Sequence, residues 1–295
     1  MHRKPSLGRK IFIVCNTIFL IFVGLACFLP MWHVLMSSIS DPAGVARNGG
    51  LLLLPLQPMT TKGYELVLTN KNMLRSYGNT FLYIIGSLSV GMILTILGAY
   101  VLSRKDLKWG GVMTFIILFT MLFNGGLIPY YILVRSLGWI NTPWALIIPG
   151  SVSVYNLIVM RTGFSQVPES LVESARIDGA SDITILLRII IPLSKAVIAV
   201  IVLFYLVTQW NSWFYPMIFL NKRQMYPLQL WLRELLITQD QAAIAQTGEM
   251  TSEMETYRVL YRFAAIIIST VPILCVYPFA QKYFVKGVML GSVKG

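Results

Sequence analysis

The sequence reads ESARIDGASDITILLRIIIP from Glu173 to Pro192. This stretch begins polar and ends apolar, and it interrupts a chain that is otherwise strongly hydrophobic. Of the 295 residues, 56% are hydrophobic and 12% are charged, whereas a soluble domain carries about 25% charged residues. A lipid solvent explains the deficit, because side chains that face lipid carry no charge. We therefore predict a membrane protein with a polar insert outside the bilayer.

Six apolar segments are long enough to cross roughly 30 Å of hydrocarbon, which takes about 20 helical residues. They cover residues 11–36, 77–102, 112–134, 142–160, 196–220 and 260–281. The first is too long for a signal peptide, and Cys27-Phe-Leu-Pro30 is no small-residue cleavage site, so we expect a retained helix. The predicted fold class is an all-α integral membrane protein, with six transmembrane helices in a single domain over residues 11–295.

The positions of the basic residues predict the orientation in the membrane. Lys and Arg gather in residues 1–10, 104–108, 161–195 and 282–294, and the positive-inside rule places such segments in the cytoplasm. Both termini, the loop 165–195 between helices 4 and 5, and the tail 282–295 are then cytoplasmic. The net charge of +12 does not indicate nucleic-acid binding, because the chain shows no nucleic-acid motif.

Local rules predict two short helices within the loop 165–195. Pro168 suits the start of a helix, and Gly179 suits a left-handed end after about Ile177. Ser181 can cap a second helix, and Pro192 forces a bend before the next membrane span. Such a helix pair could dock a soluble partner or could be a solvated connector.

The same stretch resembles the "EAA" loop of ABC-importer permease subunits. That pattern is Glu-Ala-Ala, three residues, Gly, nine residues, Ile-x-Leu-Pro, and it matches here with Ser174 and Ile191 as departures. The version Arg176-Ile-Asp-Gly-Ala-Ser181 is similar to the carbohydrate-uptake group, which includes MalG-like and LplC-like permeases. Further similarity lies in residues 76–80, 210–216, 281–287 and 291–295.

The resemblance implies how such a subunit works. The helix carrying Glu173 would dock into a cytoplasmic ABC ATPase, present in two copies, and the tail from about Lys286 would reach toward the ATPase interface. A second homologous permease would complete the pore in the bacterial cell membrane, and an extracellular sugar-binding lipoprotein would deliver an oligosaccharide. The expected coupling residues are Glu169, Glu173, Ala175, Arg176, Asp178, Gly179 and Pro192.

The sequence contains no motif for catalysis or for a cofactor. It has no phosphate-binding Gly-x-x-x-x-Gly-Lys-Ser/Thr run, and neither a Gly-x-Ser-x-Gly elbow nor a His-Glu-x-x-His motif. Its cysteines all lie in apolar segments, where they act as small hydrophobic residues. We therefore expect a non-catalytic subunit that binds no metal or cofactor itself, with ATP and Mg²⁺ held by the partner ATPase.

Polar residues within apolar spans are the candidates for a substrate path, because lipid offers them no partners. Ser212 and Asn156 belong to this group. The other candidates are Gln209, Trp210, Asn211, Trp213, Asn79 and Asn124. The alternative is that they join helices to one another and form an aromatic belt. Gly86, Gly91 and Gly98 are expected to allow close helix packing.

Two other functions fit the same features. The first is an ABC permease that carries a peptide, an amino acid or an ion. The second is a secondary transporter or membrane scaffold that needs no ATPase, although the inverted repeats of secondary transporters are not evident in the sequence.

Overall fold

A computed structural model describes residues 7–123, 125–237 and 257–292, and all regular structure in these residues is helical. The chain divides into two compact units. One comprises Met1–Lys71 and Leu235–Thr270, and the other comprises Asn72–Glu234 and Val271–Gly295. The all-α prediction is thereby confirmed for the described part of the chain.

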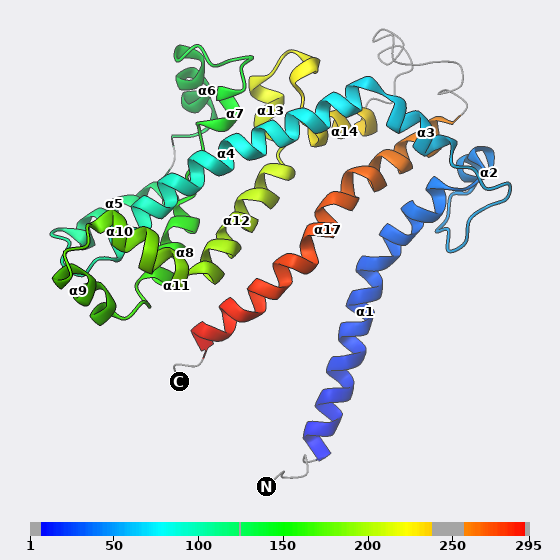
Figure 1. Cartoon of the computed structure of the whole chain (residues 1–295). Helices are drawn as coiled ribbons and strands as arrows, with labels where there is room; N and C mark the ends of the chain where they lie inside the picture. Colours follow the sequence, from blue (N-terminus) through cyan, green and yellow to red (C-terminus); the bar gives the residue numbers. More distant parts are fainter. Residues whose placement is uncertain (1–6, 124, 238–256, 293–295) are drawn as a thin grey trace. The chain divides into compact units, whose positions relative to one another are not determined.

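The first unit is built around the end of a long N-terminal helix (Figure 1). Its elements are α1 (Leu7–Ser38), α2 (Pro42–Arg47), α3 (Lys62–Thr69) and the start of α17 (Arg258–Ser292). Met36, Val45, Leu52 and Leu260 form its core. The segment after α2 is held on α1, because the Leu52 amide donates to Nδ1 of His33 at 3.0 Å.

The second unit contains the remaining helices. Its longest is α4 (Lys71–Ser103), which Figure 1 shows as one unbroken helix. The others are α5 (Gly110–Leu122), α6 (Leu127–Ser136), α7 (Trp144–Ile147), α8 (Val154–Phe164), α9 (Glu169–Ile177), α10 (Asp182–Ile185), a π-helical turn (Leu186–Ile190), α11 (Ile191–Leu193), α12 (Lys195–Trp210), α13 (Phe214–Phe219), a 3-10 turn (Arg223–Met225) and α14 (Leu228–Ile237).

Small residues let neighbouring segments approach α4 closely. A Cβ on Gly91 would lie 2.3 Å from the carbonyl oxygen of Ser151, and a Cβ on Gly98 would lie 3.0 Å from the Leu157 side chain. Nearby, Thr95 and Tyr205 share a hydrogen bond of 2.7 Å between their hydroxyl oxygens. The predicted packing role of these glycines is confirmed.

Within residues 7–123, 125–237 and 257–292, three helices are long and apolar enough to cross a membrane, or up to five if each of two bent helix pairs counts as one span. The three are α1, α4 and the segment Arg258–Val276 of α17. One bent pair is α5 with α6, and the other joins Asp182–Leu193 to α12 at an angle of 85°.

Three of the predicted continuous helices are instead interrupted. The segment 112–134 breaks between α5 and α6, 142–160 breaks between α7 and α8, and 196–220 breaks between α12 and α13. A proline lies within or just after each break: Pro149 lies within the second, and Pro129 and Pro216 follow the first and the third. A proline has no N–H, and its ring collides with the carbonyl four residues earlier, so a helix cannot continue unchanged through it. Gly126 and Gly150 add positive φ angles of 84° and 75°.

The contact at Gly91 yields a stability prediction. We expect G91A to destabilise the protein by about 1–3 kcal/mol, because the new methyl group meets a backbone carbonyl that cannot move aside. G78A lies in the same helix with nothing within 4 Å of its Cβ, and its effect should stay within about 0.5 kcal/mol. Thermal unfolding of the detergent-solubilised protein would measure both, and equal midpoints would contradict the packing role.

Candidate functional site

The three helix breaks of the second unit meet at one cavity of about 990 Å³. Gly125 and Gly126 contribute from the first break, Pro149 and Gly150 from the second, and Ser212 from the third. Irregular backbone at membrane depth is tolerated where it lines a cavity, because lipid cannot satisfy its polar groups. The three breaks therefore lie where their polar backbone groups can face the cavity instead of lipid.

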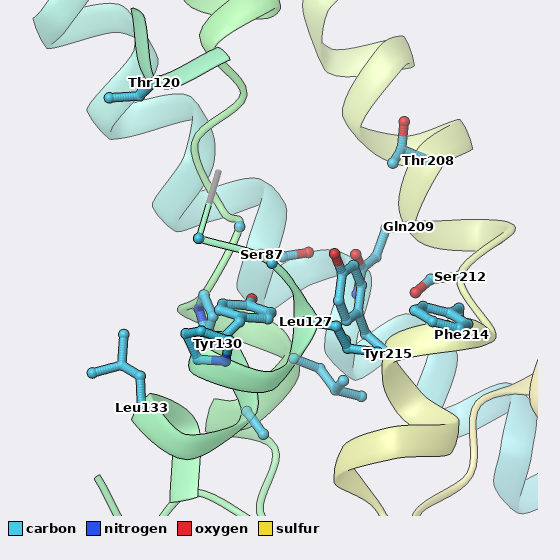
Figure 2. Close-up of a pocket in the computed structure, with 17 residues that line it drawn as sticks. Ser87, Thr120, Leu127, Tyr130, Leu133, Thr208, Gln209, Ser212, Phe214 and Tyr215 are labelled. Carbon is cyan, nitrogen blue, oxygen red and sulfur yellow. The ribbon is translucent and has the colours of Figure 1, made fainter. Parts of the chain in front are cut away.

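The lining of the cavity combines aromatic rings with small polar groups. Figure 2 shows Tyr130 and Leu133 on α6, with Gln209 of α12, Ser212 of the following break and Tyr215 of α13 on the facing side. The Tyr130 and Tyr215 rings meet edge to face, with centroids 5.5 Å apart. The side chains at the cavity carry no charge at neutral pH. The residues that line the cavity are Ser87, Thr120, Gly125, Gly126, Leu127, Pro129, Tyr130, Leu133, Ala145, Leu146, Pro149, Gly150, Thr208, Gln209, Ser212, Phe214 and Tyr215.

Of the predicted substrate-path cluster at 209–213, the cavity takes in Gln209 and Ser212. Trp210 is buried, and its ring lies against the edges of Tyr77 and Phe81. The Asn211 amide donates back to the Val207 carbonyl at 2.9 Å. The guanidinium carbon of Arg233 lies over the Trp213 ring, 4.7 Å from the centroid of that ring.

The three other asparagines are placed differently. Asn79 donates to the carbonyls of Gln224 and Tyr226 at 2.8 and 3.1 Å, so it holds the turn before α14. Asn156 is buried in α8. Asn124 lies outside the described residues.

Two of the three aromatic residues that line the cavity, Tyr130 and Tyr215, were not predicted from the sequence; the third is Phe214. The signal that could have found them is their position beside the breaking prolines. Tyr130 follows Pro129, and Tyr215 precedes Pro216.

The second candidate site is the helix pair formed by α9 and α10, which we call the α9–α10 pair. The predicted break at Gly179 is confirmed, with φ of 79°. The Gly179 amide donates to the Arg176 carbonyl at 3.0 Å, and the Ala180 amide donates to the Ala175 carbonyl at 2.9 Å. These two bonds form a Schellman motif, and the side chains of Ala175 and Ala180 pack on the same core cluster.

The start of the second helix is also as predicted. The Ser181 hydroxyl accepts from the Thr184 amide at 3.3 Å and caps α10. The π-helical turn Leu186–Ile190 then precedes Pro192, and such turns admit residues that an α-helix cannot accommodate. The chain bends by 85° before α12.

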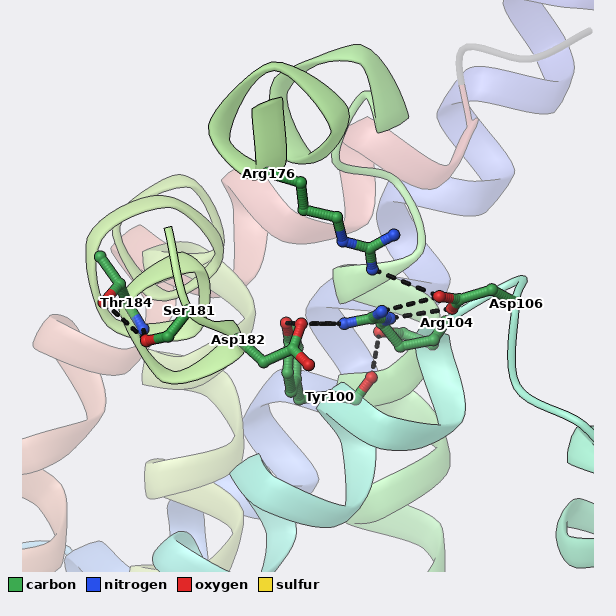
Figure 3. A network of polar contacts seen from close by, with 8 residues as sticks. Tyr100, Arg104, Asp106, Arg176, Ser181, Asp182 and Thr184 are labelled. Carbon is green, nitrogen blue, oxygen red and sulfur yellow. Dashed lines mark hydrogen bonds and ion pairs between the residues drawn. The ribbon is translucent and has the colours of Figure 1, made fainter. Parts of the chain in front are cut away.

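A network of charged side chains joins the α9–α10 pair to the end of α4 (Figure 3). Arg104 makes an ion pair with Asp182 and a two-pronged contact of 2.9 and 2.7 Å with Asp106. The hydrogen bond from Arg104 lowers the pKa of the Asp182 carboxyl. Lys105 pairs with Glu169 at 2.5 Å, and this bond raises the pKa of the lysine.

The outer surface of the α9–α10 pair presents both charge and apolar groups. Glu173 and Asp178 are exposed. Ile177 and Ile183 are 87% and 70% exposed, so both side chains lie outside the core. Exposed apolar and exposed acidic side chains therefore both occur on the α9–α10 pair.

No group of three His, Cys, Asp or Glu side chains that could hold a metal occurs in residues 7–123, 125–237 and 257–292. The apolar helices, the cavity at their breaks and the exposed helix pair together define a subunit of a membrane transport system.

The chain belongs to the family of binding-protein-dependent transport system inner membrane components, whose model matches residues 91–290. It is thus a membrane-spanning permease of the ABC-importer class, located in the bacterial cell membrane.

Individual relatives cover nearly the whole chain. It is 38% identical to Protein LplC of Bacillus subtilis (strain 168) over 100% of this chain and 98% of that protein. It is also 38% identical to the polygalacturonan/rhamnogalacturonan transport system permease protein YtcP of the same organism, over 94% and 96%. A chain in the crystal structure of a bacterial ABC transporter involved in alginate import matches with a TM-score of 0.86 and 31% identity, covering 96% of this chain and 100% of that one.

The turn at Gly179 yields a second prediction. A Cβ there would meet nothing within 4 Å, so G179A acts through the backbone alone. A side chain in the left-handed region costs about 1–2 kcal/mol, and we expect faster hydrogen exchange at Asp178–Ala180. G179N should show a smaller effect, since asparagine tolerates this conformation. Unchanged exchange in G179A would contradict this account of the turn.

Proposed function

We propose that this permease carries a saccharide, most simply an oligosaccharide. The uncharged cavity at the three helix breaks is the observation that carries the proposal. Aromatic rings such as Tyr130 and Tyr215 suit the apolar faces of sugar rings. In the described residues the Gln209 amide has no hydrogen-bond partner of its own, so it can serve sugar hydroxyls.

The relatives support the same cargo class. The names of YtcP and of the arabinooligosaccharides transport system permease protein AraQ of Bacillus subtilis both specify saccharides. Identity to AraQ is 23% over 97% of this chain. A peptide or amino-acid cargo would need charged groups to meet its termini, and the described residues that line the cavity offer none.

The proposed assembly contains this chain, a second homologous permease, two cytoplasmic ABC ATPases and an extracellular sugar-binding lipoprotein. This subunit is non-catalytic and binds no cofactor, while ATP and Mg²⁺ bind to the ATPases. We propose six spans with both termini in the cytoplasm, counting the interrupted segments as spans. The loop 165–195 and the tail 282–295 then face the ATPases.

The α9–α10 pair is the proposed docking element for an ATPase. Its exposed apolar residues Ile177 and Ile183 would enter a groove on that partner, and Glu173 would form a charge-assisted contact. Ala175 and Gly179 serve the fold of the element itself, through the Schellman turn.

The cavity proposal is tested by removing one amide. We expect Q209A to lower saccharide uptake at subsaturating concentration by roughly 2- to 12-fold, the value of one uncharged hydrogen bond. N211A is the matched control, because the Asn211 amide bonds to its own helix. Uptake of radiolabelled oligosaccharide into cells would measure both. Equal uptake in the two variants would place the substrate path elsewhere.

The docking proposal is tested at Glu173. We expect E173A to reduce ATP-driven uptake by roughly tenfold or more, since a hydrogen bond to a charged group is lost, while membrane insertion stays normal. S174A is the control, because it changes the neighbouring exposed residue on the same helix. Co-purification of the ATPase would be measured with uptake. Normal uptake in E173A would contradict the docking role of Glu173.

A further inference from the structure

Three consecutive charged residues follow α4, and each one contacts a different point of the α9–α10 pair. Arg104 pairs with Asp182 at the start of α10. Lys105 pairs with Glu169 at the start of α9, and Asp106 pairs with Arg176 near the end of α9, at 3.4 Å. Three separate contacts fix the orientation of a rigid body, whereas one or two leave it free to rotate.

Arg104 is the centre of this arrangement (Figure 3). Its side chain is only 19% exposed, whereas Asp182 is 62% exposed. It also donates to the Tyr100 hydroxyl at 3.1 Å, and that hydroxyl donates to Asp182 at 3.3 Å. Tyr100 is a buried residue of α4. The start of α10 is therefore held by Tyr100 of α4 as well as by Arg104 of the loop that follows α4.

The helix α4 extends from these contacts to the cavity. Ser87 lines the cavity, and it lies 13 residues before Tyr100, or roughly 20 Å along a continuous helix. Between them, Gly91 packs against Ser151 and Thr95 bonds to Tyr205. The Tyr205 hydroxyl also accepts from the Ser153 amide at 3.0 Å. Thus α4 contacts the break between α7 and α8 directly.

We infer that Arg104, Lys105 and Asp106 form a three-point clamp that sets the orientation of the α9–α10 pair on α4. These are positioning residues for energy coupling. A displacement of the pair by a docked ATPase moves α4, and with it the cavity wall at Ser87 and the α7–α8 break that Gly91 contacts at Ser151. The exposed pairs Lys105–Glu169 and Asp106–Arg176 are individually weak, so the clamp favours one orientation without locking the pair permanently.

The inference rests on the proposed function, so its test has one measurement that depends on transport and one that does not. The complete complex of permeases, ATPases and binding protein is reconstituted in lipid vesicles. The first measurement is saccharide accumulated per ATP hydrolysed, and the second is hydrogen exchange of residues 169–182. The variants are R104A, R104K and K105E. K108E is the matched control, with the same charge change in the same loop and no ion pair to residues 169–182 in the described structure.

We expect R104A and K105E to lower accumulation per ATP by about fivefold or more, the lower range for coupling between two sites, with faster exchange in residues 169–182. R104K should fall between R104A and wild type, because one ammonium group cannot replace the guanidinium fork. K108E should match wild type. ATPase co-purification should stay constant in K105E, whose side chain is exposed, and this excludes misfolding as the cause.

Exchange in R104A and K105E equal to that in K108E would overturn the clamp. So would unchanged accumulation per ATP in both variants. A wild-type complex that accumulates no saccharide would instead refute the proposed cargo, and the exchange measurement would still decide whether the three residues orient the α9–α10 pair.

Discussion

An unpaired backbone amide or carbonyl is costly in hydrocarbon, and this cost governs where the chain can interrupt its helices. The interruptions after α5, α7 and α12 come together at one cavity, which lets their polar groups face a wet space rather than lipid. A chain with these breaks scattered over its lipid-facing surface would leave backbone groups without partners. The helix breaks thus open the cavity, and the cavity in turn accommodates the backbone polar groups that the breaks expose.

Against these interrupted segments, α4 is continuous over 33 residues. Its small residues bring the carbonyl of Ser151 against its backbone, and Thr95 anchors the Tyr205 hydroxyl. Its far end carries the contacts to the α9–α10 pair. One continuous helix therefore contacts both the cavity and the α9–α10 pair.

The expected coupling residues of the α9–α10 pair divide into three groups when their contacts are considered. Ala175 and Gly179 build the turn, through a carbonyl that accepts and a left-handed backbone. Glu173 and Asp178 point outward from the fold. Glu169 and Arg176 lie between these groups, because each also pairs with the loop after α4. A sequence pattern does not separate these roles, since every member has the same fixed spacing.

The sequence by itself determined the all-helical class, the apolar segments, and the helix, turn and cap of residues 168–182, because these depend on composition and on rules local to a few residues. It did not determine which prolines interrupt a helix. Pro30, Pro272 and Pro278 lie inside continuous helices, whereas Pro149 lies within a break and Pro129 and Pro216 directly follow one. Tertiary structure also decided that Gln209 reaches the cavity while Trp210 is buried, and that Arg104 meets Asp182. These outcomes depend on contacts between segments far apart in the chain, and no local pattern specifies such contacts.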